Sequence, residues 1–231
     1  HETGDLAKRD AYLCELKEAQ IRDGLHIFGQ TPEGVQLRDL TIALARIPRG
    51  SGQGADASLL RAMAGDLALG FDPLDCDLAA PWTGDKPAPL SDITAERWRS
   101  TGDTVERLEL LAQALIDGTR DAPGSQSAQV MAHIRQNISP NVAACGPMEA
   151  QGFLTALDGK FVPPAPSGAP TRGRLDVLPT GRNFYSVDSR AVPTPTAWAL
   201  GWKSANLLID KHLQDHGDWP RTLLLTAWGT A

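Results

Sequence analysis

The densest group of chemically capable side chains lies between residues 178 and 190. Arg182 and Arg190 carry guanidinium groups that can clamp a carboxylate through two parallel hydrogen bonds. Phe184 and Tyr185 can pack against a flat ligand, or they can anchor the segment as part of a structural turn. From the residues alone, both interpretations stay open. The candidate ligand contacts are Thr180, Gly181, Arg182, Asn183, Phe184, Tyr185 and Arg190.

One histidine has an unusual setting. His26 lies between Leu25 and Ile27 in a short apolar run bounded by Gly24 and Gly29. Histidine can gain or lose a proton near neutral pH, and it is a common metal ligand. A histidine among apolar residues is more often a core or surface residue that has found one hydrogen bond. Local sequence alone therefore does not assign His26 a chemical role.

Two further patterns favour a structural interpretation. Residues 50–54 are rich in glycine, but no Lys-Ser or Lys-Thr pair follows, as a phosphate-binding loop would require. His212 and His216 have the spacing of two metal ligands on one helix face, but the glutamate of the zinc protease motif is absent after His212. Both histidines are expected in the last turn of a helix, where a positive side chain suits the helix dipole.

The overall composition argues against several classes of protein. Lys and Arg number 22 against 28 Asp and Glu, and the net charge of −6 disfavours sequence-independent binding to nucleic acid. No apolar run reaches the length of about 20 residues that a membrane span needs, and no signal peptide is recognisable. The three cysteines are far apart and form no CxxC pair, which disfavours a disulfide framework or a zinc site. We therefore expect reduced thiols and a cytoplasmic location.

Apolar residues at helical spacing predict a largely helical first part of the chain. Thr31 with a following proline predicts one helix start, and Asp103 with Glu106 predicts another. Gly146 and Pro147 predict the opening of a short helix. The expected helices before it cover residues 6–22, 31–48, 55–68, 104–117 and 126–138, with residues 70–100 as a connecting segment.

The second part of the chain has a different composition. Seven of the 38 residues in 158–195 are proline and four are glycine, which is incompatible with a helix or a central strand. We expect an ordered loop that lies over a scaffold. A long helix from Thr194 to about Gln214 and a buried parallel strand over 222–228 should follow. The expected fold class is α/β, with a mainly helical portion 1–157, the Pro/Gly-rich loop 158–195, and the start of a doubly wound layer over 196–231.

Long ordered strings of this sequence match a known family: residues 20–29, 56–61, 156–164, 166–172, 177–185, 192–195 and 214–220. They closely resemble the large-subunit family of aerobic cobaltochelatases. The H-subunit family of magnesium chelatases is similar more distantly, and Phe184-Tyr185 after Gly-Arg-Asn favours the cobalt branch. Because the family's chain is much longer, we expect an internal piece that is not a competent chelatase alone.

This resemblance implies substrates and partners. The family's large subunit binds a corrin-type tetrapyrrole, hydrogenobyrinic acid a,c-diamide, and Co²⁺ is the second substrate, inserted into the ring. ATP and Mg²⁺ are used by a separate AAA+ motor subunit, a further subunit bridges the complex, and no cofactor is expected to bind tightly here. Two alternatives stay open: a scaffold module whose loop 158–195 docks the motor subunit, and a magnesium chelatase large subunit that acts on protoporphyrin IX.

The chemistry implied by the resemblance suggests roles for the candidate residues. A tetrapyrrole is flat and apolar across its faces and carries carboxylates at its rim, features that suit aromatic rings and Arg forks. Insertion needs a base for the protons of the ring nitrogens and a ligand that hands over the metal. His26 is the first candidate for either task, including metal ligation, and Asp188 is the second.

Overall fold

The computed structural model describes residues 27–182 and 193–224. The predicted helix 6–22, the candidate His26 and residues 225–228 of the predicted strand lie outside the described residues. The same holds for five candidates in the cluster 178–190: Asn183, Phe184, Tyr185, Asp188 and Arg190.

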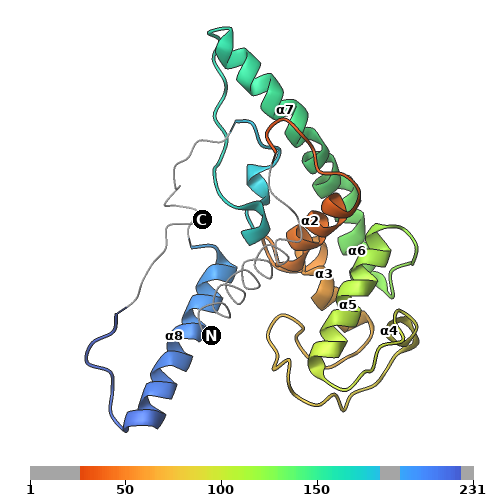
Figure 1. Cartoon of the computed structure of the whole chain (residues 1–231), viewed down its shortest axis with the longest axis vertical. Helices are drawn as coiled ribbons and strands as arrows, with labels where there is room; N and C mark the ends of the chain where they lie inside the picture. Colours follow the sequence, from red (N-terminus) through yellow and green to blue (C-terminus); the bar gives the residue numbers. More distant parts are fainter. Residues whose placement is uncertain (1–26, 183–192, 225–231) are drawn as a thin grey trace, which may run out of the picture.

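A bundle of helices forms the main body of the protein (Figure 1). It contains α2 (Gly34–Arg46), α3 (Leu59–Asp66), α5 (Thr101–Ile116) and α6 (Ser125–His133). In each helix, apolar residues at three- and four-residue spacing form a face that can leave water. The expectation of helices in these parts of the chain is confirmed. Side chains from the bundle meet in a core that is almost fully buried, among them Leu44, Leu60, Met63, Leu108 and Leu111.

Helix α5 begins three residues earlier than predicted. Its N-cap is Ser100, whose hydroxyl accepts a hydrogen bond from Asp103 N–H at 3.1 Å, while the Asp103 carboxylate accepts one from Ser100 N–H at 2.9 Å. This reciprocal pair is a capping box. The prediction of Asp103 and Glu106 as the box was wrong, because Asp103 occupies the third helical position rather than the cap. Hydrogen bonds from the backbone of Arg99 and Ser100 hold the pKa of Asp103 below its ordinary value.

The glycine-rich turn between α2 and α3 is built around an arginine. Arg49 is only 6% exposed, and its guanidinium donates to the backbone carbonyls of Ala55 and Ala57 at 2.8 and 3.2 Å. These contacts hold residues 50–54 as a turn that leads to Ser58, the N-cap of α3.

Helix α6 continues into α7 without interruption. A π-helical turn, η2 (Ile134–Ile138), links α6 to α7 (Ser139–Leu157), and Pro147 lies inside α7. The prediction that one helix ends near residue 138 and a short one opens at Gly146 and Pro147 was therefore wrong. Proline lacks the N–H that would bond to the carbonyl four residues earlier. The Thr31 hydroxyl donates to that carbonyl, which belongs to Ala143, and this contact compensates for the lost helical bond.

Aromatic contacts hold the predicted connecting segment 70–100 against the bundle. This segment contains one short helix, α4 (Ala88–Ser91). Trp82 packs edge-on against Phe71 and stacks with Trp98, at ring-centroid distances of 5.2 and 6.3 Å. Trp98 Nε1 donates to Thr104 Oγ1 on α5 at 2.7 Å. The segment is thus fixed to α5 although it has little regular structure.

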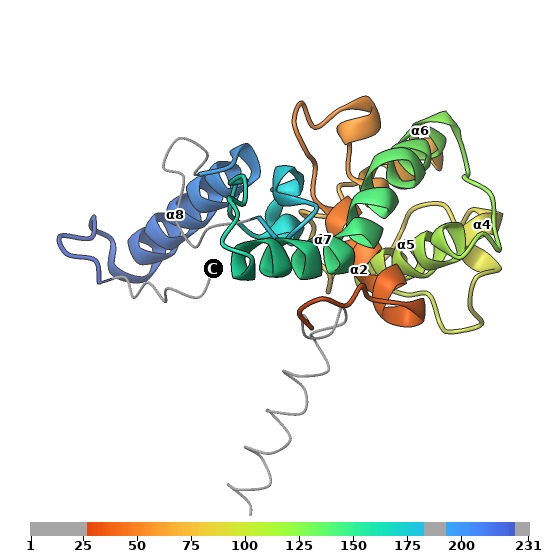
Figure 2. The same cartoon turned by 90° about the horizontal axis from the view of Figure 1, so that it is seen from above.

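After α7 the chain reverses and runs back toward the bundle (Figures 1 and 2). This loop includes two 3₁₀ turns, η3 (Pro170–Arg172) and η4 (Leu175–Val177). Val177 is 2% exposed, and Leu175 and Leu178 pack against the core of the bundle. Residues 175–178 of the Pro/Gly-rich loop therefore lie over the helical scaffold.

Helix α8 (Pro195–His216) lies at the opposite side of the molecule from α4 and α5 (Figures 1 and 2). The Thr194 hydroxyl caps it by accepting a hydrogen bond from Ala197 N–H, which confirms the predicted start. Gly217 ends it with φ of 72°. Although α8 has 22 residues, none of them is buried.

No β-strand occurs in the described ranges 27–182 and 193–224. Residues 222–224, the start of the predicted strand, have no regular structure, and the other positions of that strand are not described. The described fold is rich in helix, and the α/β layer stays a prediction. Of the helices in these ranges, none is both long enough and apolar enough to cross a membrane.

Candidate functional site

Two segments that are far apart in the sequence meet on one helix. Residues 29–31 precede α2, and residues 180–181 lie near the end of the loop that returns from α7. Both segments contact α7 between Ala143 and Gly152. We call this meeting point the α7 junction; it consists of Gly29, Gln30, Thr31, Ala143, Cys145, Gly146, Glu149, Gly152, Thr180 and Gly181.

Pro147 leaves one backbone carbonyl of α7 available to the first segment. Because Pro147 has no N–H, the carbonyl of Ala143 receives no helical hydrogen bond from it. Thr31 Oγ1 donates to that carbonyl at 3.1 Å and replaces the missing donor. The prediction of Thr31 as a helix cap was wrong for this reason, and α2 begins at Gly34. A Cβ on Gly146 would lie 2.7 Å from the Thr31 nitrogen, so glycine permits this close approach.

Glycines also let the second segment approach α7. A Cβ on Gly152 would lie 2.5 Å from the carbonyl oxygen of Gly181, and a Cβ on Gly181 would lie 2.6 Å from the Glu149 nitrogen. Gly181 has φ of 100°, which other residues adopt only with strain. The N–H of Thr180 donates to Cys145 Sγ at 3.4 Å. The backbone of residues 180–181 therefore lies directly on the helix.

Glu149 connects the two segments. It is 3% exposed. Its Oε2 accepts a hydrogen bond from Gly29 N–H at 2.7 Å, and its Oε1 accepts one from the Thr180 hydroxyl. Burying a carboxylate is costly unless hydrogen bonds replace its lost hydration. The two segments supply such bonds, and the carboxylate in turn fixes both segments to α7.

The structure describes three of the predicted ring contacts and brings them together. Thr180 and Gly181 lie in the α7 junction, and Arg182 follows directly. The Arg182 carbonyl accepts a hydrogen bond from Ala165 N–H at 2.8 Å. The Arg182 side chain is half-buried, and its Nε has no hydrogen-bond partner in the described part of the chain. This guanidinium forms no ion pair with a carboxylate of the described residues.

Exposed apolar side chains border the α7 junction. Phe28 packs edge-on against Phe153 at a ring-centroid distance of 6.1 Å, and both side chains are more than half exposed. Leu154 and Leu157 are exposed further along α7. This end of α7 therefore presents apolar surface next to the segment that leads to Arg182.

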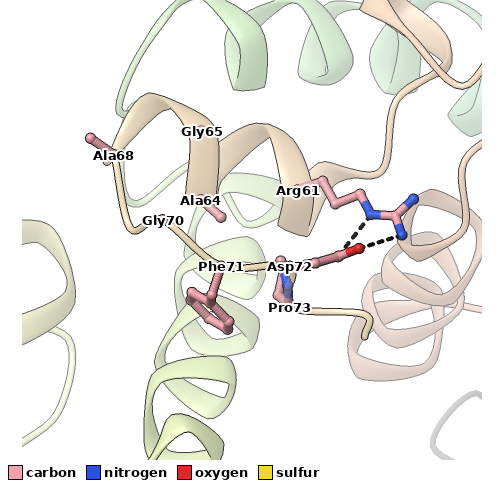
Figure 3. Close-up of a pocket in the computed structure, with 8 residues that line it drawn as sticks. All are labelled: Arg61, Ala64, Gly65, Ala68, Gly70, Phe71, Asp72 and Pro73. Carbon is pink, nitrogen blue, oxygen red and sulfur yellow. Dashed lines mark hydrogen bonds and ion pairs between the residues drawn. The ribbon is translucent and has the colours of Figure 1, made fainter. Parts of the chain in front are cut away.

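A hollow of about 490 Å³ lies elsewhere, between α3 and residues 70–73 (Figure 3). Its lining includes Arg61 and Asp72, which form two hydrogen bonds at 2.9 and 2.7 Å. The Arg61 guanidinium, through these bonds, lowers the pKa of the Asp72 carboxyl. The two charges neutralise each other, and none of the described candidate residues lines this hollow. The α7 junction is the better candidate site.

The described ranges contain no group of three His, Cys, Asp or Glu side chains arranged to hold a metal ion. His212 and His216 stack their rings at a centroid distance of 4.3 Å, and His216 Nδ1 lies 3.2 Å from the His212 carbonyl oxygen. The metal role considered for His26 concerns a residue outside these ranges and stays a prediction.

Glu149 was missed by the sequence analysis. Its signal was weak: one acidic residue in a stretch of small and apolar residues, with Gly146 three positions before it and Gly152 three positions after it. Residues three apart are neighbours on a helix surface. An acid between two such glycines indicates a helix face over which another backbone passes closely.

We expect Gly152→Ala to disturb the α7 junction. The added methyl group would lie 2.5 Å from the Gly181 carbonyl oxygen, so residues 180–182 must shift. Overpacking of this kind costs about 1–3 kcal/mol, and the free energy of unfolding in denaturant should fall by that amount. Gly201→Ala on α8 is the matched control, because its Cβ would meet nothing within 4 Å. That control should be neutral or stabilising by up to about 1 kcal/mol; equal losses for both variants would contradict the close contact.

Comparison with known proteins identifies the family. Residues 2–231 match the family described as CobN/Magnesium Chelatase. The chain is 56% identical to the aerobic cobaltochelatase subunit CobN of Sinorhizobium sp. and 55% identical to that of Pseudomonas aeruginosa, each over 98% of this chain. It spans 19% and 18% of the length of those two relatives. Magnesium-chelatase H subunits match at lower identity.

A solved structure supports the same relationship. The catalytic subunit of cobaltochelatase from Mycobacterium tuberculosis matches 86% of this chain with 34% identity and a TM-score of 0.54, and the match covers 15% of that structure. The resemblance inferred from the matched strings is thereby confirmed. Because the family match covers nearly the whole length of the chain and the fold is shared with the solved cobaltochelatase subunit, the chain belongs to the CobN/magnesium chelatase family.

Proposed function

We propose that this chain is part of the ring-binding large subunit of an ATP-dependent cobaltochelatase. That enzyme inserts Co²⁺ into hydrogenobyrinic acid a,c-diamide in aerobic cobalamin biosynthesis. The observation that carries the proposal is the high identity to cobaltochelatase subunits along nearly the whole chain. Because the chain spans about a fifth of those relatives, it supplies one part of the enzyme and is not expected to act alone.

The surroundings of the α7 junction suit a tetrapyrrole. The ring is flat and apolar across its faces, and exposed apolar side chains such as Phe28 and Phe153 border the junction. Its rim carries carboxylates, which a guanidinium can bind through two parallel hydrogen bonds. Arg182 follows a backbone that α7 holds in place, so its reach toward the ring is restricted. Restricting a binding group before the ligand arrives lowers the entropy cost of binding.

Metal insertion requires further groups. A base must take the protons of the ring nitrogens, and a ligand must release Co²⁺ into the ring. His26 is proposed for either task, with Asp188 second. Co²⁺ is a substrate here, while ATP and Mg²⁺ are used by a separate AAA+ motor subunit that acts with a bridging subunit. No tightly bound cofactor is assigned to this chain.

A scaffold or docking role is the second candidate function. Helix α8 has no buried residue, and Trp198 and Trp202 on it are 62% and 64% exposed while they stack on each other. Exposed aromatic residues of this kind are typical of surfaces that another protein part covers. In this alternative, the chain docks the motor subunit, and the ring is held elsewhere.

Titration with the ring distinguishes these functions. We expect the complete large subunit to bind hydrogenobyrinic acid a,c-diamide with saturable quenching of tryptophan fluorescence. Arg182→Ala should raise the Kd about tenfold or more, the loss expected when a charged hydrogen-bonded pair is removed. Arg172→Ala, at an exposed position of the same loop, is the matched control and should leave the Kd unchanged.

Each alternative gives a different result in this titration. Tighter binding of protoporphyrin IX than of the corrinoid would assign the subunit to the magnesium branch. Unchanged affinity in the Arg182→Ala subunit would place the ring away from the α7 junction and favour the docking role for this part of the chain.

Substitution of the proposed insertion residues should separate binding from chemistry. In the complete subunit with its motor partners, His26→Ala and Asp188→Ala should slow Co²⁺ insertion while ring affinity is largely kept, because a base or metal ligand acts after the ring is bound. The measurement is turnover beside the ring Kd. Unchanged turnover would remove the substituted residue from the mechanism.

A further inference from the structure

Glu149 occupies a position where α7 itself needs no acid. It lies in the middle of the helix rather than in the first turn, where a carboxylate would stabilise the helix dipole. At 3% exposure, its carboxylate has lost nearly all contact with water at a considerable cost in free energy. A residue with this cost is expected to serve something other than helix formation.

The two carboxylate oxygens bond to different segments. Oε2 accepts from Gly29 N–H at 2.7 Å, and Oε1 accepts from the Thr180 hydroxyl. In the sequence, Gly29 follows His26 by three residues, and Thr180 precedes Arg182 by two. One side chain therefore links the segment after the candidate base to the segment that leads to the candidate ring contacts.

The neighbouring contacts leave this link little freedom. Gly146 and Gly152 allow both backbones to lie within 3 Å of where a Cβ would stand. The Thr31 hydroxyl and the Thr180 N–H each add a further hydrogen bond from one segment to α7. A shift of either segment would break a hydrogen bond to the buried Glu149 side chain, which is unfavourable.

We propose that Glu149 is a positioning residue for the tetrapyrrole site. It holds residues 29–31 and residues 180–182 in one arrangement, so that Phe28, next to Gly29, and Arg182, next to Gly181, act on the same ligand. This inference rests on the proposed function, because it requires that the subunit binds a tetrapyrrole at this place. Loss of the link should weaken ring binding while the core of the bundle, in which Glu149 takes no part, stays folded.

Three variants of the complete large subunit test the role of Glu149. Glu149→Ala removes both links, and Thr180→Val removes one while the bond to Gly29 remains. Glu149→Gln keeps both, because its amide oxygen can accept from Gly29 N–H while its NH₂ group donates to the Thr180 hydroxyl. If the alanine variant does not fold, the other two variants still decide the question.

The readouts are the Kd for hydrogenobyrinic acid a,c-diamide and amide hydrogen exchange in residues 29–31 and 180–182. We expect the Kd to rise about tenfold or more in Glu149→Ala and about threefold in Thr180→Val, and to stay within about twofold in Glu149→Gln. Exchange should rise in both segments together in Glu149→Ala, because one side chain protects both. If Glu149 had only a structural role, the Kd for the ring would not rise in step with the number of hydrogen bonds lost between Glu149 and the two segments.

Asp66 provides a matched control. Its carboxylate also accepts from a backbone N–H and a hydroxyl, both of Ser127, but it does so at the start of α6. Asp66→Ala should lower the free energy of unfolding and leave the Kd for the ring unchanged. An equal loss of ring affinity in this variant would mean that general destabilisation is the cause, and the positioning role would be rejected.

The remaining outcomes are also decisive. Wild-type affinity in Glu149→Ala or in Thr180→Val would overturn the inference alone. A loss in Glu149→Gln as large as in Glu149→Ala would overturn it too, because the negative charge rather than the geometry would then matter. If the wild-type subunit binds no ring while exchange shows the two segments linked, the proposed function has failed and the inference falls with it.

Discussion

A carboxylate that leaves water must find hydrogen-bond donors inside the protein, and Glu149 finds them 120 residues before it and 31 residues after it. This requirement ties together parts of the chain that helix packing alone would leave independent. The segment before α2 and the end of the Pro/Gly-rich loop are both fixed to α7 because each donates to the same side chain. In the positioning role proposed above, the arrangement of the candidate site relies on this buried group, which both segments share.

Helix α7 is suited to this task by residues that usually weaken a helix. Pro147 leaves the Ala143 carbonyl without its helical donor, and the Thr31 hydroxyl takes that place. Gly146 and Gly152 lower helix propensity, but they allow other backbones to lie on the helix surface. These residues thus lower the local stability of α7 but permit tertiary contacts. They lie where residues 29–31 and residues 180–181 contact the helix.

The helical bundle could be predicted from the sequence because its signals are local. Leu108, Leu111 and Leu115 repeat at helical spacing on α5 and are almost fully buried. The start of α8 was also correct, since Thr194 and Pro195 form a local cap. The continuous passage from α6 into α7 was missed, because Pro147 indicates a break when only its neighbours in sequence are considered.

The α7 junction could be predicted only in part. Thr180, Gly181 and Arg182 were predicted as ring contacts from their chemical types and their matched motif, and that role stays a prediction, whereas Glu149 was not singled out. A buried acid is recognised by its donors, and those donors are distant in sequence, so no local pattern marks it. Thr31 was misassigned for the same reason, because its partner on α7 lies 112 residues away.

In the proposed function, these contacts form one wall of a tetrapyrrole site in the large subunit of a cobaltochelatase. The most direct test of this account is a structure of the complete large subunit with hydrogenobyrinic acid a,c-diamide bound. The account predicts that the ring lies beside the α7 junction, with a rim carboxylate on Arg182 and with Glu149 still bonded to Gly29 and Thr180. A ring bound away from residues 180–182, or a junction in which Glu149 has released either segment, would contradict it.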